Sequence, residues 1–275
     1  MEVILGKHAG FCFGVKRAVE QAYREGMQHP CATLGALIHN PQEVERLRTA
    51  GIRVVHGPEE VRKGETLILR SHGVGPDVIA QAAELGIPII DLTCPHVAHV
   101  HELVRNSADP VIIIGEPNHP EVKGIAGWAK APVVVIPTVD AAKACILPEH
   151  ATVVAQTTLR RETFDAVLEV LRQRIPVLTV HRTICSATGQ RQEEARKLAR
   201  DADAVIVVGG QNSSNTNKLL ETCAETCPRS ILVETPEDIP EGFLREEDRV
   251  AVTAGASTPP WLLEVVCARI HGTKS

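Results

Sequence analysis

Three cysteines lie far apart in this chain but share one local setting. Cys12, Cys94 and Cys185 each follow an apolar run typical of a β-strand, and each precedes a segment with the helical spacing of apolar residues. The start of a helix stabilises a thiolate, because its unpaired N–H groups and its dipole favour negative charge. Three such turns indicate one arrangement built three times, and thiolates that converge would form a metal or cluster site.

The kind of metal is narrowed by the cysteine spacing. Thiolates select zinc, copper(I) or iron–sulfur clusters. Structural zinc usually takes closely spaced cysteine pairs, which these three do not form. A cubane cluster normally takes four cysteines, so three would leave one iron open as a Lewis acid. Each cysteine taken alone is equally explained as a small buried hydrophobe, but the shared setting favours a common site.

Polar loops follow the first and third strands expected in each repeat. These loops carry His39, His119 and Asn215 after the first strands and His72, Thr157 and Ser257 after the third strands. In open α/β sheets, ligands bind beyond the carboxyl ends of the strands, so we expect these loops to face the same centre. Serine and asparagine here are first of all helix N-caps, but the start of a helix also binds phosphate. With Ser213, the set favours a phosphate or diphosphate site, without a Rossmann fingerprint or a P-loop.

Glu121 is the one carboxylate within these loops, next to His119 and Pro120. A glutamate in the first turn of a helix is also explained by the helix dipole. Its functional interpretation is a proton donor, aided by the hydroxyl of Thr157.

The elements that must position these residues alternate between strands and helices. Strands are predicted at 3–5, 32–38, 52–55, 66–69, 87–90, 111–114, 133–136, 152–155, 177–180, 204–208, 231–233 and 250–253, and helices at 15–28, 42–47, 77–85, 97–106, 162–173, 190–200, 216–226 and 261–270. Such alternation predicts an α/β fold with parallel sheets. We expect three small parallel-sheet lobes in a pseudo-threefold arrangement around a central cavity.

The lobe boundaries follow the cysteines. Lobe 1 is expected at residues 12–94, lobe 2 at 95–184 and lobe 3 at 185–275. Lobe 3 lacks the final strand that the other two lobes have, and the first strand of the chain lacks a lobe. We therefore expect residues 1–11 to complete the sheet of lobe 3.

Composition excludes several other classes of protein. The 275 residues are 44% hydrophobic and 23% charged, as in an ordinary globular protein. A net charge of −5 and an aromatic content of 3% do not favour nucleic-acid binding. No apolar run is long enough to span a membrane, and the start of the chain does not look like a secretory signal. Eight cysteines then favour a reducing cytoplasm and metal-binding or catalytic roles.

Other cysteines and histidines are weaker candidates. His96, His99 and His101 suggest a zinc site, but a partly solvated helix face explains His96 and His99 better. Cys223 and Cys227 are predicted to share one face of a helix, but no nearby pair of ligands completes a metal site. The other three cysteines are interpreted as packing residues; they are Cys31, Cys145 and Cys267.

With these residues identified, the chain resembles the 4-hydroxy-3-methylbut-2-enyl diphosphate reductase (IspH/LytB) family. The motifs that carry the resemblance run in order through the whole chain: Gly10-Phe11-Cys12, His39-Asn40, Ser71-His72-Gly73-Val74, Thr93-Cys94-Pro95, His119-Pro120-Glu121-Val122, Gln156-Thr157-Thr158, Ile184-Cys185, Asn212-Ser213-Ser214-Asn215 and Ala254-Gly255-Ala256-Ser257. One departure is Ile125, where the family would have threonine; we interpret it as a packing residue.

The resemblance implies an oxidoreductase of the methylerythritol phosphate route to isoprenoids. It implies a [4Fe–4S] cluster on Cys12, Cys94 and Cys185 with one open iron, and an allylic diphosphate substrate. Glu121 with Thr157 would deliver protons, and His119 would support Glu121 or reach the diphosphate. The resemblance places the diphosphate among His39, His72, Ser213, Asn215 and Ser257, with Ser214 close by. A ferredoxin or flavodoxin would supply electrons.

Two other functions stay open at this point. An iron–sulfur hydro-lyase of the aconitase kind also uses an open iron but consumes no electrons. A zinc-stabilised module that binds phosphate groups would contain zinc without sulfide.

Overall fold

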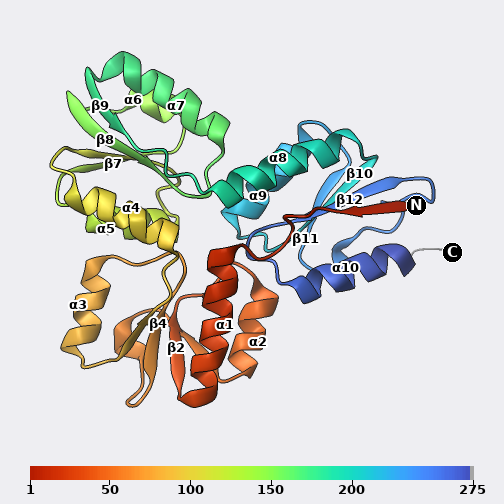
Figure 1. Cartoon of the computed structure of the whole chain (residues 1–275), viewed down its shortest axis with the longest axis horizontal. Helices are drawn as coiled ribbons and strands as arrows, with labels where there is room; N and C mark the ends of the chain where they lie inside the picture. Colours follow the sequence, from red (N-terminus) through yellow and green to blue (C-terminus); the bar gives the residue numbers. More distant parts are fainter. Residues whose placement is uncertain (273–275) are drawn as a thin grey trace. The chain divides into compact units, whose positions relative to one another are not determined.

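The computed structural model describes residues 1–272 and contains three four-stranded sheets in which every strand pairing is parallel (Figure 1). The strand orders are β3-β2-β4-β5, β7-β6-β8-β9 and β11-β10-β12-β1. The three sheets therefore repeat one order, and three parallel-sheet α/β lobes are confirmed.

Each sheet is built from strands that alternate with helices. The first contains β2 (Cys31–Leu34), β3 (Ile52–Val55), β4 (Thr66–Leu69) and β5 (Ile89–Asp91), with α1 (Phe13–Gln28), α2 (Pro41–Thr49), η1 (Pro58–Glu60) and α3 (Pro76–Glu84). The second contains β6 (Val111–Ile114), β7 (Val133–Ile136), β8 (His150–Ala155) and β9 (Val177–Val180), with α4 (Pro95–Asn106), α5 (Pro120–Trp128), α6 (Val139–Ala144) and α7 (Arg161–Arg174). The third contains β10 (Ala204–Val208), β11 (Ser230–Val233), β12 (Arg249–Ala254) and β1 (Glu2–Leu5), with α8 (Ser186–Arg200), α9 (Ser214–Ala224), η2 (Pro236–Asp238) and α10 (Pro260–Gly272).

The N-terminal strand completes the third sheet, as the sequence predicts. β1 pairs with β12 in parallel, from Glu2 opposite Arg249 to Leu5 opposite Val252. In strand order β1 takes the edge position that β5 and β9 take in the other sheets. Cys12, Cys94 and Cys185 are therefore reached from three equivalent edge strands.

The central strands are continuous apolar runs because helices pack on both faces of the sheet. In β6, Ile112 and Ile114 pack in a cluster with Phe164 of α7. Val111 and Ile113 pack on the opposite face with residues of α4 and α5. Ile125 is fully buried in that second cluster, which confirms its interpretation as a packing residue.

Two helices were not predicted, and one strand is shorter than predicted. α5 and α6 lie where the sequence shows no long apolar periodicity. The strand predicted at 32–38 ends at Leu34. Gly35 still donates its N–H to the carbonyl of Val55 in the neighbouring strand, but its φ of +67° then turns the chain out of the extended conformation.

By its internal contacts the chain forms two compact units. One comprises Met1–Lys16, Ile38–Val44 and Ser186–Ser275, and the other Arg17–Leu37 and Glu45–Cys185. The second unit therefore contains two of the three sheets, and the lobe boundaries at residues 94 and 184 stay predictions. No helix among residues 1–272 is long and apolar enough to cross a membrane.

Within the second unit, glycines allow the loop before α3 to contact α5 closely. A β-carbon on Gly127 would lie 3.1 Å from the Cα of Gly75, and one on Gly124 would lie 3.5 Å from the backbone of Gly73. The indole N–H of Trp128 donates to the carbonyl of Val74 at 2.9 Å. The end of α5 is thus joined to the loop that carries His72.

This contact predicts different outcomes for two glycine substitutions in one helix. Alanine in a helix is favoured over glycine by about 1 kcal/mol, and Gly124→Ala should gain part of that because its β-carbon makes only ordinary contacts. Gly127→Ala should lose that gain, because its β-carbon forces the Gly75 backbone away. Urea unfolding should therefore give Gly127→Ala the lower midpoint, and equal midpoints would contradict the close contact.

Candidate active site

The three cysteines occupy the same structural position. Each is the residue immediately before a helix: Cys12 before α1, Cys94 before α4 and Cys185 before α8. Each cysteine N–H donates to a carbonyl two residues after the third strand of its own sheet. The acceptors are Ala256 at 3.1 Å for Cys12, Ser71 at 3.0 Å for Cys94 and Thr157 at 2.9 Å for Cys185. One hydrogen bond, used three times, fixes the backbone of each cysteine.

Three of the other five cysteines differ from these three in the pKa of their thiols. All eight cysteines are free thiols, and Cys12, Cys94 and Cys185 are half-buried. Burial raises the pKa of Cys223 to about 12, with a contribution from Cys227, and burial also raises the pKa of Cys31 and Cys267. Thiols of this kind stay protonated, which agrees with the packing role predicted for Cys31 and Cys267. The predicted placement of Cys223 and Cys227 on one helix is wrong, because α9 ends at Ala224.

In the second unit, Glu121 is a buried carboxylate clamped by Thr157. Its side chain is 2% exposed and lies in the first turn of α5. The Thr157 N–H donates to Oε1 at 2.6 Å, and the Thr157 hydroxyl donates to Oε2 at 2.9 Å. The carbonyl of Thr157 accepts the Cys185 N–H, so one residue holds both a cysteine and the carboxylate. The predicted association of Glu121 with Thr157 is present.

His119 lies at the start of the helix that carries Glu121, and His72 lies beside His119. His119 is the N-cap of α5, and its Nδ1 accepts the N–H of Glu121 at 3.1 Å. Since Nδ1 is an acceptor, the neutral ring carries its proton on Nε2. The ring of His72 meets that of His119 edge to face, with centroids 5.8 Å apart. Neighbouring contacts thus connect Thr157, Glu121, His119 and His72.

In the first unit, the start of α9 presents polar side chains. Ser213 is the N-cap, and its Oγ accepts the N–H of Thr216 at 3.3 Å. Asn215 is buried, and its Nδ2 has no hydrogen-bond partner among residues 1–272. Lys218, which the sequence analysis missed, donates to Oγ of Ser214 at 2.7 Å and adds a positive charge.

His39 and Ser257 meet in the same unit. The Ser257 hydroxyl donates to the carbonyl of His39 at 3.1 Å. Ser257 directly follows Ala256, the residue that accepts the Cys12 N–H. The first unit therefore brings His39 and Ser257 together near the turn that carries Cys12.

The predicted register of the loops needs correction. The helix caps that correspond to one another are Asn40, His119 and Ser213, because each accepts an N–H from the first turn of its helix. His39 thus precedes its cap, His119 is a cap, and Asn215 follows one. After the third strands, Thr157 corresponds to Ser71 and Ala256 rather than to His72 and Ser257.

Further residues, which no sequence motif indicates, hold the cysteine turns. Thr183 accepts the N–H of Ala155 at 2.8 Å and donates to the Ala155 carbonyl at 2.7 Å, just before Cys185. Arg17 donates to the carbonyl of Thr93 at 2.6 Å, and Arg191 to that of Gly10 at 2.7 Å. These are arginine and threonine contacts over long sequence distances, which no local pattern indicates.

The histidines after Cys94 do not form a zinc site. His96 and His99 are exposed, as a solvated helix face predicts. His101 is buried and stacks on Trp128 with ring centroids 5.7 Å apart. Across the described part of the chain, no group of three or more His, Cys, Asp or Glu side chains is placed to hold a metal ion.

The fold and these residues define a class of α/β protein: three parallel sheets, a cysteine before a helix beside the edge strand of each, and one buried carboxylate at a helix start. A family model described as "LytB protein" matches residues 3–271. The chain belongs to the LytB family.

Relatives and solved structures align with nearly the whole of this chain. A 4-hydroxy-3-methylbut-2-enyl diphosphate reductase of Caldanaerobacter subterraneus subsp. tengcongensis is 39% identical and aligns over 100% of this chain and 98% of its own. The Geobacter metallireducens protein of that name is 42% identical, over 98% of this chain and 97% of its own.

Among solved structures, that of (E)-4-hydroxy-3-methyl-but-2-enyl diphosphate reductase, "the Terminal Enzyme of the Non-Mevalonate Pathway", is 40% identical with a TM-score of 0.72. The match covers 99% of this chain and 100% of that one. The reductase from Plasmodium falciparum is 27% identical with a TM-score of 0.91, over 100% of this chain and 88% of that one.

The buried histidine predicts a pH effect on stability. Burial lowers the pKa of His101 to about 4, although Asp91 opposes the shift. The unfolded chain binds this proton near pH 6.5, so stability should fall as the pH drops from about 6.5 towards 4. NMR titration of the ring checks the pKa directly. His101→Phe, which keeps an aromatic ring against Trp128, should remove this part of the pH dependence; a ring that titrates near 6.5 would contradict it.

Proposed function

We propose that the chain catalyses the reductive dehydroxylation of (E)-4-hydroxy-3-methylbut-2-enyl diphosphate to isopentenyl and dimethylallyl diphosphates, the last step of the methylerythritol phosphate route. The observation that carries this proposal is the full-length match to LytB relatives that bear this reductase's name. In the overall reaction the substrate takes up two electrons and two protons, and its hydroxyl leaves as water.

The cysteine turns fit an iron–sulfur cluster. Cys12, Cys94 and Cys185 are half-buried thiols at helix starts with their backbones held alike, which suits thiolate ligands. These three residues would hold a [4Fe–4S] cluster. When bound, the cluster would supply electrons and, at an iron without a cysteine ligand, a Lewis-acid position.

The polar helix starts would bind the diphosphate. Asn215 offers a buried amide, Ser213 caps α9, and Lys218 adds positive charge beside Ser214. Backbone N–H groups at a helix start favour phosphate. We assign substrate binding to His39, His72, His119, Thr157, Ser213, Ser214, Asn215 and Ser257.

Glu121 would deliver the proton, with Thr157 and His119 as its neighbours. A carboxylate with two hydrogen bonds from Thr157 is held in one orientation. Burial at 2% exposure keeps bulk water away from it. The Thr157 hydroxyl lies 2.9 Å from Oε2, so it can pass a proton between the carboxyl group and a bound substrate.

Electrons would come from a ferredoxin or flavodoxin, and the enzyme would work in the cytoplasm. The need for a reductant separates this activity from that of an aconitase-like hydro-lyase, which uses none. Metal and sulfide analysis of anaerobically purified protein separates it from a zinc-containing module.

Removing one proposed cluster ligand should abolish the intact cluster. For Cys94→Ser we expect iron and sulfide contents far below those of the wild type after anaerobic reconstitution. Cys145→Ser is the matched control, because Cys145 is also half-buried but packs against the core of the second sheet. Full iron and sulfide in Cys94→Ser would remove Cys94 from the ligand set.

Removing the proposed proton donor should slow turnover and leave the cluster intact. Glu121→Gln should lower kcat by roughly 10²- to 10⁴-fold, with iron, sulfide and substrate affinity close to wild type. Assays with the allylic diphosphate and a chemical reductant measure this directly.

The control for Glu121→Gln is Glu162→Gln. Both glutamates are the second residue of a helix, but Glu162 lies on the exposed first turn of α7. Wild-type kcat in Glu121→Gln, or an equal loss in both variants, would exclude Glu121 as the donor.

A further inference from the structure

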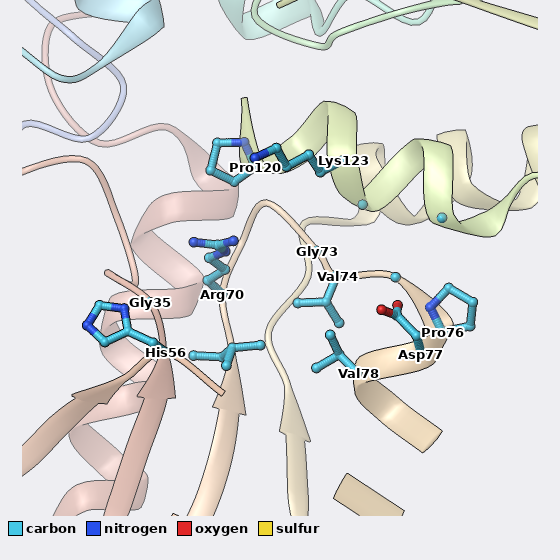
Figure 2. A pocket seen from close by; sticks show the side chains of 14 residues that line it. Gly35, His56, Arg70, Gly73, Val74, Pro76, Asp77, Val78, Pro120 and Lys123 are labelled. Atoms are coloured by element: carbon cyan, nitrogen blue, oxygen red, sulfur yellow. The ribbon is translucent and has the colours of Figure 1, made fainter. Parts of the chain in front are cut away.

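A pocket of about 500 Å³ lies within the second unit, outside the residues assigned to the reaction. Its wall is formed by the end of β2, the residues after β2, β3 and β4, the start of α3, and α5 (Figure 2). None of the proposed cysteine ligands, diphosphate ligands or proton-transfer residues lines it. The pocket therefore shares no residue with the site described above, although it adjoins the loops that carry His72 and His119.

The charged side chains of the pocket are mostly basic. Two cationic side chains, Arg70 and Lys123, line it with the imidazole of His56, against one acidic residue, Asp77. Figure 2 shows Arg70 extending from the loop after β4 towards the first turn of α5, where Lys123 lies. The carboxylate of Asp77 instead folds back over Gly75 at the start of α3. Arg70 and Lys123 thus form the cationic side of the pocket, whereas His56 lies beside the carboxylate of Glu60, which accepts its backbone N–H at 2.9 Å.

Arg70 is the central group on this side. It is half-buried, its Nε is buried, and that atom has no hydrogen-bond partner among the described residues. Burial lowers the pKa of its guanidinium, although an arginine stays charged at neutral pH. No ion pair of Arg70 or Lys123 occurs in the part of the chain that the structure describes. A partly buried guanidinium whose charge no carboxylate balances would be stabilised by a bound anion.

Gly35 makes room for this arginine. A β-carbon at Gly35 would lie 2.6 Å from Nη1 of Arg70, and Gly35 has a φ of +67° that disfavours other residues. The guanidinium therefore lies directly against the backbone after β2. Beside it, Leu34, Val74 and Val78 give the pocket an apolar wall.

We propose that this pocket binds a small anion that carries a phosphate or diphosphate group, with Arg70 and Lys123 as its cationic ligands. The planar guanidinium provides paired donors for phosphate oxygens, and the lysine adds a point charge. The apolar wall would accommodate the hydrocarbon part of a phosphate ester. Gly73 and Pro120, which line the pocket, are the sequence neighbours of His72 and His119, so a bound anion would contact the loops that carry them.

The test is calorimetric titration of the full-length protein with inorganic diphosphate. We expect two classes of site in the wild type. Lys123→Met should weaken one class about tenfold or more and leave the other, because it removes a charged donor from an exposed helix position. Arg70→Met should weaken the same class; if circular dichroism shows that it does not fold, Lys123→Met decides alone. The control Lys143→Met, at an exposed position of α6, should change neither class.

Further arms separate this site from the proposed substrate site. His72→Asn should weaken only the other class of site. If His72→Asn changes nothing while Lys123→Met removes one class, the pocket stands and the proposed diphosphate contact of His72 fails. A single class in the wild type, or equal weakening of both classes by Lys123→Met, would overturn the second site.

Two more probes distinguish a phosphate ester from a free phosphate or diphosphate as the natural ligand of the pocket. Inorganic phosphate and isopentenyl diphosphate are titrated into His72→Asn, where the pocket should dominate binding. Tighter binding of isopentenyl diphosphate than of inorganic diphosphate indicates a phosphate ester, and equal binding indicates a free anion. Absence of binding by all three anions would overturn the proposal.

Discussion

The hydrogen bond from each cysteine N–H to the turn after the third strand is the constraint on which the site depends. Ala256, Ser71 and Thr157 supply the carbonyls, at 3.1, 3.0 and 2.9 Å. The bond forms because parallel pairing brings the carboxyl ends of neighbouring strands to one edge of the sheet. It requires an edge strand in every sheet, and the pairing of β1 with β12 meets that requirement in the third. The first residues of the chain are thus part of the site's framework.

In only one sheet does the residue that accepts the cysteine N–H also bind a carboxylate. Thr157 accepts from Cys185 with its carbonyl and donates to Glu121 with both its N–H and its hydroxyl. A carboxylate that is 2% exposed needs such donors, because desolvation without hydrogen bonds disfavours its charge. Ser71 and Ala256 have the same backbone role, but no buried glutamate lies at the corresponding helix positions.

Strands and long helices could be predicted because the pattern of apolar residues that indicates each element lies within the element itself. Val111–Ile114 is buried on both faces and is a continuous apolar run, so its bounds match the prediction. The helix α5 could not be predicted from the sequence, because Gly124 and Gly127 lower its helix propensity. Those glycines are explained only by the close approach of a loop far away in the sequence. The roles of Thr183 and Arg17 could not be predicted for a related reason. Their hydrogen-bond partners are backbone carbonyl groups, which every residue has.

The three equivalent helix starts show how a repeated framework can hold different chemistry. The second residue of the helix after the first strand is Gln42 in α2, Glu121 in α5 and Asn215 in α9. The amide atoms Oε1 of Gln42 and Nδ2 of Asn215 are buried without hydrogen-bond partners within residues 1–272, whereas each oxygen of the Glu121 carboxylate accepts a hydrogen bond from Thr157. An amide at this position can bind a ligand but cannot release a proton at neutral pH, and a carboxyl group can. Since backbone geometry is shared, the choice of one side chain separates a binding position from a proton-transfer position. The sequence shows that these three residues differ in type. Only the helix caps Asn40, His119 and Ser213, once aligned, reveal that the three residues occupy the same position of the repeat.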